Sequence, residues 1–161
     1  GELDISFTRD NFQSDEIESK FVLREPLIFI LPKEHPLAKY ERIPVQALDG
    51  IDFIIPSDEQ SKMLHDAILN FAKDHGIEFN IVQKADNILF NINSIGIGLG
   101  CTILPGYIAP LTMNNTVIRP LDVELPSLDL FVSYRKNSNS TAVQKFMDLL
   151  SKVFYLDFNQ S

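Results

Sequence analysis

Clusters of basic residues are scarce in this sequence. It has 14 Lys and Arg against 22 Asp and Glu, which gives a formal net charge of -8. The longest basic stretch is the pair Arg135 and Lys136. Proteins that bind nucleic acid place clustered Lys and Arg against the phosphates. The composition therefore argues against a nucleic-acid-binding surface in this chain.

Cysteine is almost absent, and histidines are few and scattered. The single Cys101 lies inside an apolar run, so no disulfide framework or paired-cysteine metal site can form, and a buried core thiol in a reducing compartment is expected. His65 and His75 are ten positions apart on one predicted helix, which is the wrong spacing for a metal-binding pair. We expect no metal, no cofactor and a cytoplasmic location.

Long apolar runs and catalytic signatures are also missing. No apolar run approaches the roughly 18 residues that a membrane span needs, so we expect no membrane partner. No Gly-x-Ser-x-Gly motif is present, and nothing else predicts an enzyme. Residues 1–5 show no basic leader followed by an apolar core, although an exported chain could have lost its signal peptide. Because residues 3–7 already alternate as a strand does, we expect a piece of a longer protein.

The residues that are present predict a packed α/β fold. Of the 161 residues, 45% are hydrophobic and 22% are charged, which suits one domain or two small lobes with a core. Apolar spacing predicts a polar loop at 11–20, a helix after Ser61 that ends at Gly76, and a helix at 141–154 with capping-box spacing at Thr141 and Gln144. Strands alternate with helices, which favours a mainly parallel sheet covered by helices. The other expected elements are a helix at 88–95 and strands at 3–7, 21–23, 26–31, 51–55, from 79, 101–104, 117–121 and 128–134.

Three segments in order resemble the effector-binding domain of LysR-type transcriptional regulators. They are residues 1–7, residues 25–32 with the following 35–38, and the glycine-rich stretch 98–105 that ends at Pro105. Each segment alone is unspecific, but their order and spacing are similar to that family over nearly the whole chain.

The resemblance implies a periplasmic-binding-protein-like fold of two lobes, with a small molecule bound between them. Residues 25–128 would form a complete second lobe, and residues 1–24 and 129–161 a partial first lobe. The family's winged helix-turn-helix would lie in a missing N-terminal segment, and DNA would be bound only through it. An effector would act by its differential affinity for two conformations. The intact protein would be a homodimer or tetramer. A solute-binding protein of a transport system remains the alternative, and an enzyme built on the related fold remains a weaker one.

Candidate ligand-binding residues follow the strand at 51–55. Open α/β sheets bind ligands outside the carboxyl ends of their strands, where Ser57, Gln60 and Ser61 precede a helix. Helix N-terminal N–H groups and Ser hydroxyls suit an anion, although Asp58 and Glu59 would repel one, and both serines could instead cap the helix. By resemblance, Met63 and Leu64 would also approach the effector, while their helical spacing fits the core equally well.

Other candidates come from the two ends of the chain and from the glycine-rich stretch. Arg9 follows the strand at 3–7, and some similar regulators of aromatic-carboxylate pathways carry a cleft arginine there. Its guanidinium could pair with a carboxylate or lie solvated on the surface, and Thr8 could add a hydroxyl. Phe131 could line the cleft or belong to the core. Gly98 could contact ligand, but turn geometry is the simpler interpretation.

Overall fold

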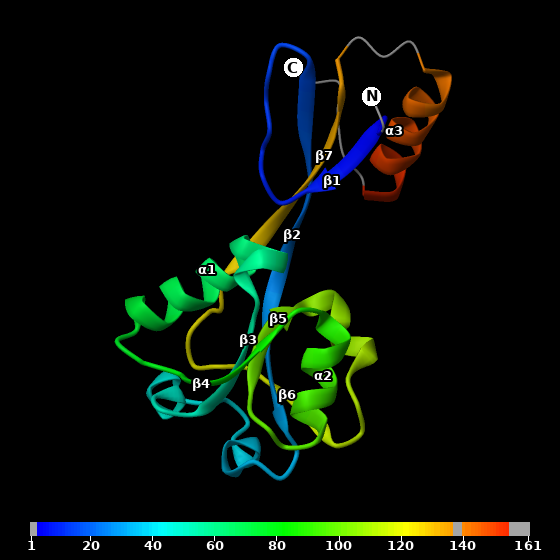
Figure 1. Cartoon of the computed structure of the whole chain (residues 1–161). Coiled ribbons are helices and arrows are strands. Elements are labelled where there is room, and N and C mark those ends of the chain that lie inside the picture. The colour runs from blue at the N-terminus through cyan, green and yellow to red at the C-terminus, as the bar shows by residue number, and fades with distance from the viewer. Residues whose placement is uncertain (1–2, 137–139, 155–161) are drawn as a thin grey trace. The chain divides into compact units, whose positions relative to one another are not determined.

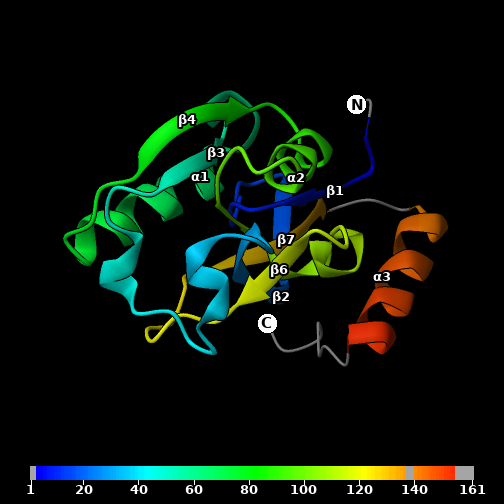
Figure 2. The same ribbon diagram turned by 90° about the horizontal axis from the view of Figure 1, so that it is seen from below.

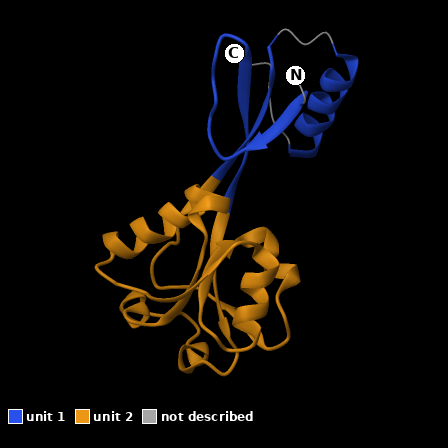
Figure 3. Cartoon of the chain, in the orientation of Figure 1, with its two compact units in different colours: residues 1–25, 129–161 blue, residues 26–128 orange. Residues whose placement is uncertain are grey.

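The computed structural model describes residues 3–136 and 140–154. The chain divides into two compact units (Figure 3): unit 1 comprises residues 1–25 and 129–161, and unit 2 comprises Pro26–Leu128. Two strands, β2 (Ile17–Pro32) and β7 (Ser127–Arg135), each contribute residues to both units. The sequence therefore passes between the units within continuous strands.

Unit 1 is a small sheet with one helix. Strand β1 (Ile5–Thr8) pairs antiparallel with β7, which lies next to β2 in the sheet. Helix α3 (Thr141–Phe154) contributes Leu150 to a buried cluster with Val22 and Val132. Apolar residues of the strands and of the C-terminal helix thus pack together in one core.

The start of α3 differs from the predicted capping box. The hydroxyl of Ser140 accepts a hydrogen bond from the backbone N–H of Val143 at 3.4 Å. Ser140 therefore occupies the capping position, and Thr141 is the first helical residue rather than the cap. The capping-box prediction was wrong by one residue because serine and threonine stand side by side here.

The strands of unit 2 belong to two sheets, and most of their pairings are antiparallel. Strand β2 pairs antiparallel with β5 (Thr102–Pro105) and with β6 (Thr116–Arg119), whereas β3 (Asp52–Pro56) and β4 (Asn80–Ala85) pair parallel. The prediction of a mainly parallel sheet was wrong. Alternation of strands and helices enforces parallel pairing only within a strand–helix–strand unit such as β3–α1–β4.

Strand β2 is also longer than predicted. It begins at Ile17, inside the segment expected to be a loop, and it joins the two predicted strands 21–23 and 26–31 into one. Short 3-10 helices complete unit 2: η1 (Pro36–Lys39), η2 (Val45–Leu48) and η3 (Gly106–Leu111).

Helices α1 (Asp58–Asp74) and α2 (Ile88–Gly96) lie where the apolar periodicity placed them. Each helix is followed, two residues after its last residue, by a glycine with positive φ: Gly76 at 63° and Gly98 at 83°. After α2, the N–H of Gly98 donates to Ile95 O at 2.9 Å and that of Leu99 to Ser94 O at 3.0 Å. This pair of hydrogen bonds is the Schellman arrangement, which requires the left-handed conformation that glycine tolerates.

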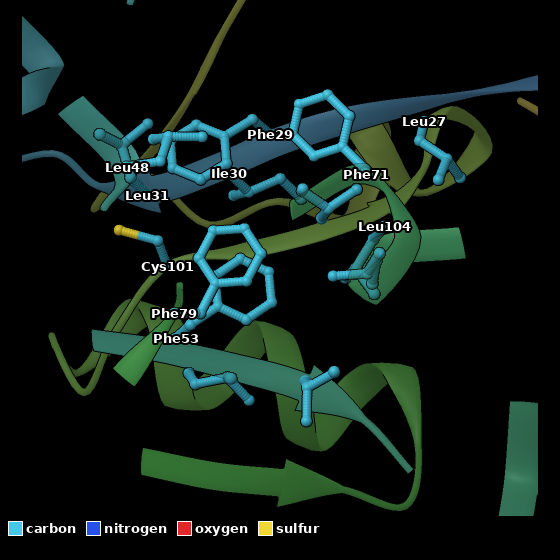
Figure 4. Close-up of a cluster of buried hydrophobic side chains, with 14 of the residues drawn as sticks. Leu27, Phe29, Ile30, Leu31, Leu48, Phe53, Phe71, Phe79, Cys101 and Leu104 are labelled. Carbon is cyan, nitrogen blue, oxygen red and sulfur yellow. The ribbon is translucent and has the colours of Figure 1, made fainter. Parts of the chain in front are cut away.

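The core of unit 2 gathers side chains from β2, β3, β5 and α1 (Figure 4). The Phe53 and Phe79 rings are stacked, with centroids 4.1 Å apart and planes at 13°. Cys101 is fully buried beside them, and this burial raises the pKa of its thiol to about 12. The thiol therefore stays protonated and inert at neutral pH, as expected for a core cysteine. None of the helices in the described ranges has the length and apolar character that a membrane crossing demands.

Candidate functional site

The carboxyl ends of β3 and β4 form one edge of unit 2 at which two helices begin. The N–H of Ser57, which follows β3, donates to the carbonyl of Ala85, the last residue of β4, at 2.9 Å. Helix α1 starts directly after Ser57, and α2 starts three residues after Ala85. Figures 1 and 2 show both helices leaving this edge. Helix starts present N–H groups that lack partners within the helix, so this edge is suited to polar or anionic ligands.

Helix α1 is interrupted after its first turn. Ser61 has φ -152° and ψ 72°, which is not helical, so the first turn and the segment from Lys62 onward are separated by a kink. The edge therefore contains two successive helix starts on one chain, one after Ser57 and one after Ser61. His65 fixes the second start to β3, because its Nδ1 lies 2.8 Å from the carbonyl of Pro56. A carbonyl only accepts, so this nitrogen carries the proton.

The Ser57 side chain does not cap α1. Ser57 has the extended backbone of an N-cap residue, but its hydroxyl makes no capping hydrogen bond, and the residue is only 4% exposed. The capping interpretation is therefore wrong for this hydroxyl. A nearly buried hydroxyl that is not committed to the helix is available to a bound group at the same edge.

The charges at this edge are partly balanced. The Nζ of Lys84 on β4 lies 3.4 Å from the Asp58 carboxylate. The hydrogen bond to its own backbone N–H and the neighbouring Lys84 lower the pKa of Asp58, so the carboxylate stays charged and paired at neutral pH. Only Glu59, which is exposed, adds an unmatched negative charge in the first turn. The expected repulsion of an anion is thereby reduced.

Two asparagines of α2 belong to this region and were not predicted. Asn87 caps the helix, because its Oδ1 accepts from the N–H of Phe90 at 2.8 Å. One turn later, Asn91 is 1% exposed, and its Oδ1 has no hydrogen-bond partner among the described residues. Leaving a buried acceptor unpaired costs about 1–3 kcal/mol. The sequence signal for Asn87 was its place just before a predicted helix, whereas Asn91 was hidden inside an apolar run.

Three of the remaining candidates lie in unit 1. Thr8 is the last residue of β1, it is paired in register with Phe131 of β7, and Arg9 follows it. Phe131 is half-buried, and its ring packs edge-on against Phe21 with centroids 6.0 Å apart. The structure therefore pairs Thr8 with Phe131, with Arg9 next in the chain, and it places Phe131 at the margin of the core rather than inside it.

A cluster of hydroxyls lies beside Thr8 within unit 1. Ser133 Oγ lies 3.3 Å from Thr8 Oγ1 and 2.6 Å from Ser19 Oγ, and Ser19 in turn donates to the carbonyl of Phe12. Because that carbonyl takes the Ser19 proton, Ser133 must donate to Ser19. Ser133 then has lone pairs left to accept from a ligand, because the Thr8 hydroxyl donates its own proton to the Asp10 carbonyl at 2.8 Å. Spacing in the sequence gave no sign of this contact between residues 114 positions apart.

In unit 2, the predicted residues are not all at the strand-end edge. Gln60 and Met63 are exposed there, with Met63 at 43%, while Leu64 is buried in the core at 4%. Gly98 lies elsewhere: Gly100, two residues later, packs against the backbone of Asp52 at the opposite, amino end of β3. The structure thus groups Ser57, Gln60, Ser61 and Met63, and it leaves Gly98 as a helix-ending residue.

Comparison with known proteins gives a consistent picture. A family model described as the LysR substrate binding domain matches residues 1–154. The Hca operon transcriptional activator HcaR of Escherichia coli is 33% identical over 152 residues, covering 94% of this chain and 51% of that protein. The regulator CatR of Pseudomonas putida is 26% identical, covering 94% of this chain and 52% of CatR. The chain thus spans about half the length of the curated relatives it matches.

Solved structures show the same fold. The regulatory domain of Synechocystis CcmR in complex with 2-PG superposes with a TM-score of 0.80 at 20% identity, covering 99% of this chain and 76% of that one. The effector-binding domain of QuiR in complex with shikimate gives 0.78 at 19% identity, covering 95% and 72%. That of BenM with benzoate gives 0.77 at 16% identity, covering 95% and 70%.

Proposed function

Since the chain belongs to the family of LysR substrate-binding domains, we propose that its effector contacts the edge where β3 and β4 end. The observation that carries this proposal is the pair of adjacent helix starts at that edge, with the nearly buried Ser57 hydroxyl uncommitted to either helix. Ser61, Gln60 and Met63 surround the same edge. Within unit 1, Thr8, Arg9 and Phe131 form the second group of effector contacts.

We infer that the effector is a small carboxylate. Helix starts and hydroxyl donors favour an anion, and an arginine after β1 supplies a guanidinium that can pair with a carboxylate bidentately. Benzoate and shikimate, which are named with two of the structural neighbours, are both carboxylates. The paired Asp58 and Lys84 leave this part of unit 2 able to accept such a charge.

At the level of the intact protein, we propose a cytoplasmic homodimer or tetramer that binds DNA through a segment outside this chain. Unit 2 would serve as the second lobe of the sensing domain, and unit 1 would be part of the first. Effector binding would change the DNA contacts only if the effector binds two conformations with different affinities. The chain would bind its effector without converting it.

The comparisons favour a regulator over a transport protein. The relatives described above are transcriptional regulators, and the structural neighbours are regulatory or effector-binding domains. A solute-binding protein would share the lobed architecture, but the family model that matches this chain is that of the LysR regulators.

The proposal is tested by thermal unfolding of the chain with a panel of small carboxylates, each paired with its neutral amide. A ligand that binds only the folded state stabilises it by about 2.7 kcal/mol at 100 times its Kd. We expect a carboxylate, but not its amide, to raise the Tm. Ser57→Ala should weaken binding about 3- to 10-fold, which corresponds to one lost hydrogen bond.

Ser127→Ala is the matched control, because Ser127 is exposed at the start of β7 in the same unit. Arg9→Ala tests the group in unit 1 in the same assay. Equal affinity in the Ser57 and Ser127 variants, or a Tm that no carboxylate raises, would refute the proposed site.

A further inference from the structure

Unit 2 contains a concavity whose lining residues are separate from those of the strand-end edge. It has a volume of about 320 Å³ and lies between β2, β6 and the segment 120–125. Its floor is formed by the buried Leu27, Phe29 and Leu121, and the half-buried Ile118 and Val123 form part of its sides. None of the residues proposed above to contact the effector lines it. Volumes from about 300 Å³ upward with mostly apolar walls are typical of small-molecule sites.

The walls of this groove are held in place by backbone hydrogen bonds. The N–H of Ile43 donates to Pro120 O at 2.9 Å, and the N–H of Asp122 donates to Ile43 O at 2.9 Å. At the other end of the segment, the N–H of Leu27 donates to Pro126 O at 3.2 Å. The segment is thus fixed at one end to Ile43 and at the other to Leu27 of β2. A ligand would enter a preformed site and would lose little affinity to ordering of the protein.

Two arginines line the groove, and most of their donors are unused. Arg42 Nη1 donates to the carbonyl of Leu121 at 2.6 Å, while Arg119 donates through Nε to Ala38 O and through Nη1 to Ile118 O, both at 3.1 Å. These contacts orient each guanidinium but engage a minority of its N–H groups. Within the described ranges, no carboxylate lies within ion-pair distance of either arginine.

We propose that this groove is a second small-molecule site, which takes a monocarboxylate with a flat or branched apolar body. The apolar floor and sides would cover the body, and the guanidiniums would pair with the carboxylate. Two unpaired cations beside one cavity are notable in a chain whose net charge is -8. Glu124, exposed at the same groove, would repel a second carboxylate. The site therefore selects against dicarboxylates.

Benzoate is a suitable probe, and amide NMR shifts of the whole chain report where it binds. We expect saturable shifts at Ile28, Ile118 and Val123, with weaker effects from the neutral benzyl alcohol. Arg42→Gln should reduce the affinity at least about tenfold, the loss expected for a charged hydrogen bond. Lys73→Gln is the matched control, because it removes the same charge from an exposed position near the end of α1.

The outcomes separate this groove from the effector site proposed above. Shifts confined to residues near Ser57 and Asn87 would refute the groove as a binding site and leave the effector site standing. Shifts at the groove alone would support the groove and count against the effector site. Equal affinity in the Arg42 and Lys73 variants would overturn the role of the guanidinium. The absence of saturable shifts at the groove with about 10 mM benzoate, tenfold above a millimolar Kd, would overturn the groove as a binding site. If Arg42→Gln fails to fold, Val123→Phe fills the groove instead and should abolish the shifts.

Discussion

Two glycines after α2 are required for different physical reasons. Gly98 has a φ of 83°, but a Cβ there would meet nothing within 4 Å. At Gly100, a Cβ would lie 2.8 Å from the carbonyl oxygen of Asp52 and 3.0 Å from its carbon. We therefore expect Gly100→Ala to destabilise the fold by about 1–3 kcal/mol through overpacking against a backbone that cannot move. Gly98→Ala should cost about 1 kcal/mol, from backbone conformation alone. Urea unfolding measures both.

Asparagine distinguishes the two causes. It tolerates the left-handed conformation better than other side chains, so Gly98→Asn should recover part of the loss seen with alanine. Gly100→Asn should be at least as unstable as Gly100→Ala, since any Cβ meets Asp52. Equal losses at both positions, or a rescue at Gly100, would contradict this assignment.

Single residues show where local pattern was a sufficient guide to the site and where it was not. The strand-to-helix junction singled out Ser57 and Ser61 because two periodicities meet there, and both serines do lie at helix starts. The buried Asn91 was missed, since one polar residue in an apolar run reads as an interruption of the pattern. Its unpaired Oδ1 depends on which side chains pack against α2, and these come from distant parts of the chain.

At the scale of secondary-structure elements, the hydrogen bond that caps the short helix η1 depends on pH. The unprotonated Nδ1 of His35 accepts a hydrogen bond from the N–H of Leu37 at 3.2 Å. Burial lowers the pKa of His35 from its ordinary value of 6.5, although Asp52 opposes this shift. The folded state thus favours the neutral ring. Its contribution to stability is present above pH 6.5 and is lost as the pH falls through the lower pKa of the folded state.

We therefore expect the Tm to decrease more steeply below pH 6.5 in the native chain than in His35→Asn. Asparagine can cap the helix and does not titrate. The difference between the two proteins should be about 1 kcal/mol or less, the value of one capping interaction. Parallel Tm profiles for the two proteins between pH 7 and pH 5 would show that His35 does not link pH to stability.

Element boundaries could be predicted where apolar spacing is regular. The range predicted for α3 is the range observed, 141–154, because its amphipathic repeat is unbroken. Strand β2 was split in two, because Arg24 and Glu25 interrupt its apolar pattern. In the structure, Arg24 is satisfied by Asp129 of β7, with Nε to Oδ1 at 2.7 Å and Nη2 to Oδ2 at 3.1 Å. That partner is 105 positions away, so the continuity of the strand was not a local property.

At the scale of the whole molecule, fold class was more predictable than strand direction. Amphipathic helices alternating with apolar strands indicated an α/β fold, and the ordered segments indicated the LysR family, which the family match confirms. The antiparallel pairing of β2 with β5 and β6 was not predicted. Strand direction depends on how the chain returns to β2 after long connections, and hydrophobic periodicity contains no information about this return.

The two units differ in the size of their cores, and this predicts unequal stability. Among the described residues, the buried cluster of unit 1 consists of Val22, Val132 and Leu150, whereas that of unit 2 extends from Leu27 to Leu128 and includes residues of β2, β3, β4, β5 and β7. Local opening requires less free energy where fewer apolar contacts are broken. We expect amides of β1 to exchange with solvent at least about tenfold faster than those of β5, a gap of about 1.4 kcal/mol or more.

A cavity in each core tests whether the units open separately. Leu150→Ala should accelerate exchange in β1 and β7 and leave β5 protected, because Leu150 packs only in the cluster of unit 1. Ile103→Ala, which removes a fully buried side chain of β5, should lower protection throughout unit 2. Leu→Ala and Ile→Ala changes in cores cost about 2–5 kcal/mol, so both effects are measurable by mass spectrometry. If Leu150→Ala lowered protection in β5 as much as in β1, the chain would unfold as one cooperative body, and the small core of unit 1 would be stabilised by unit 2.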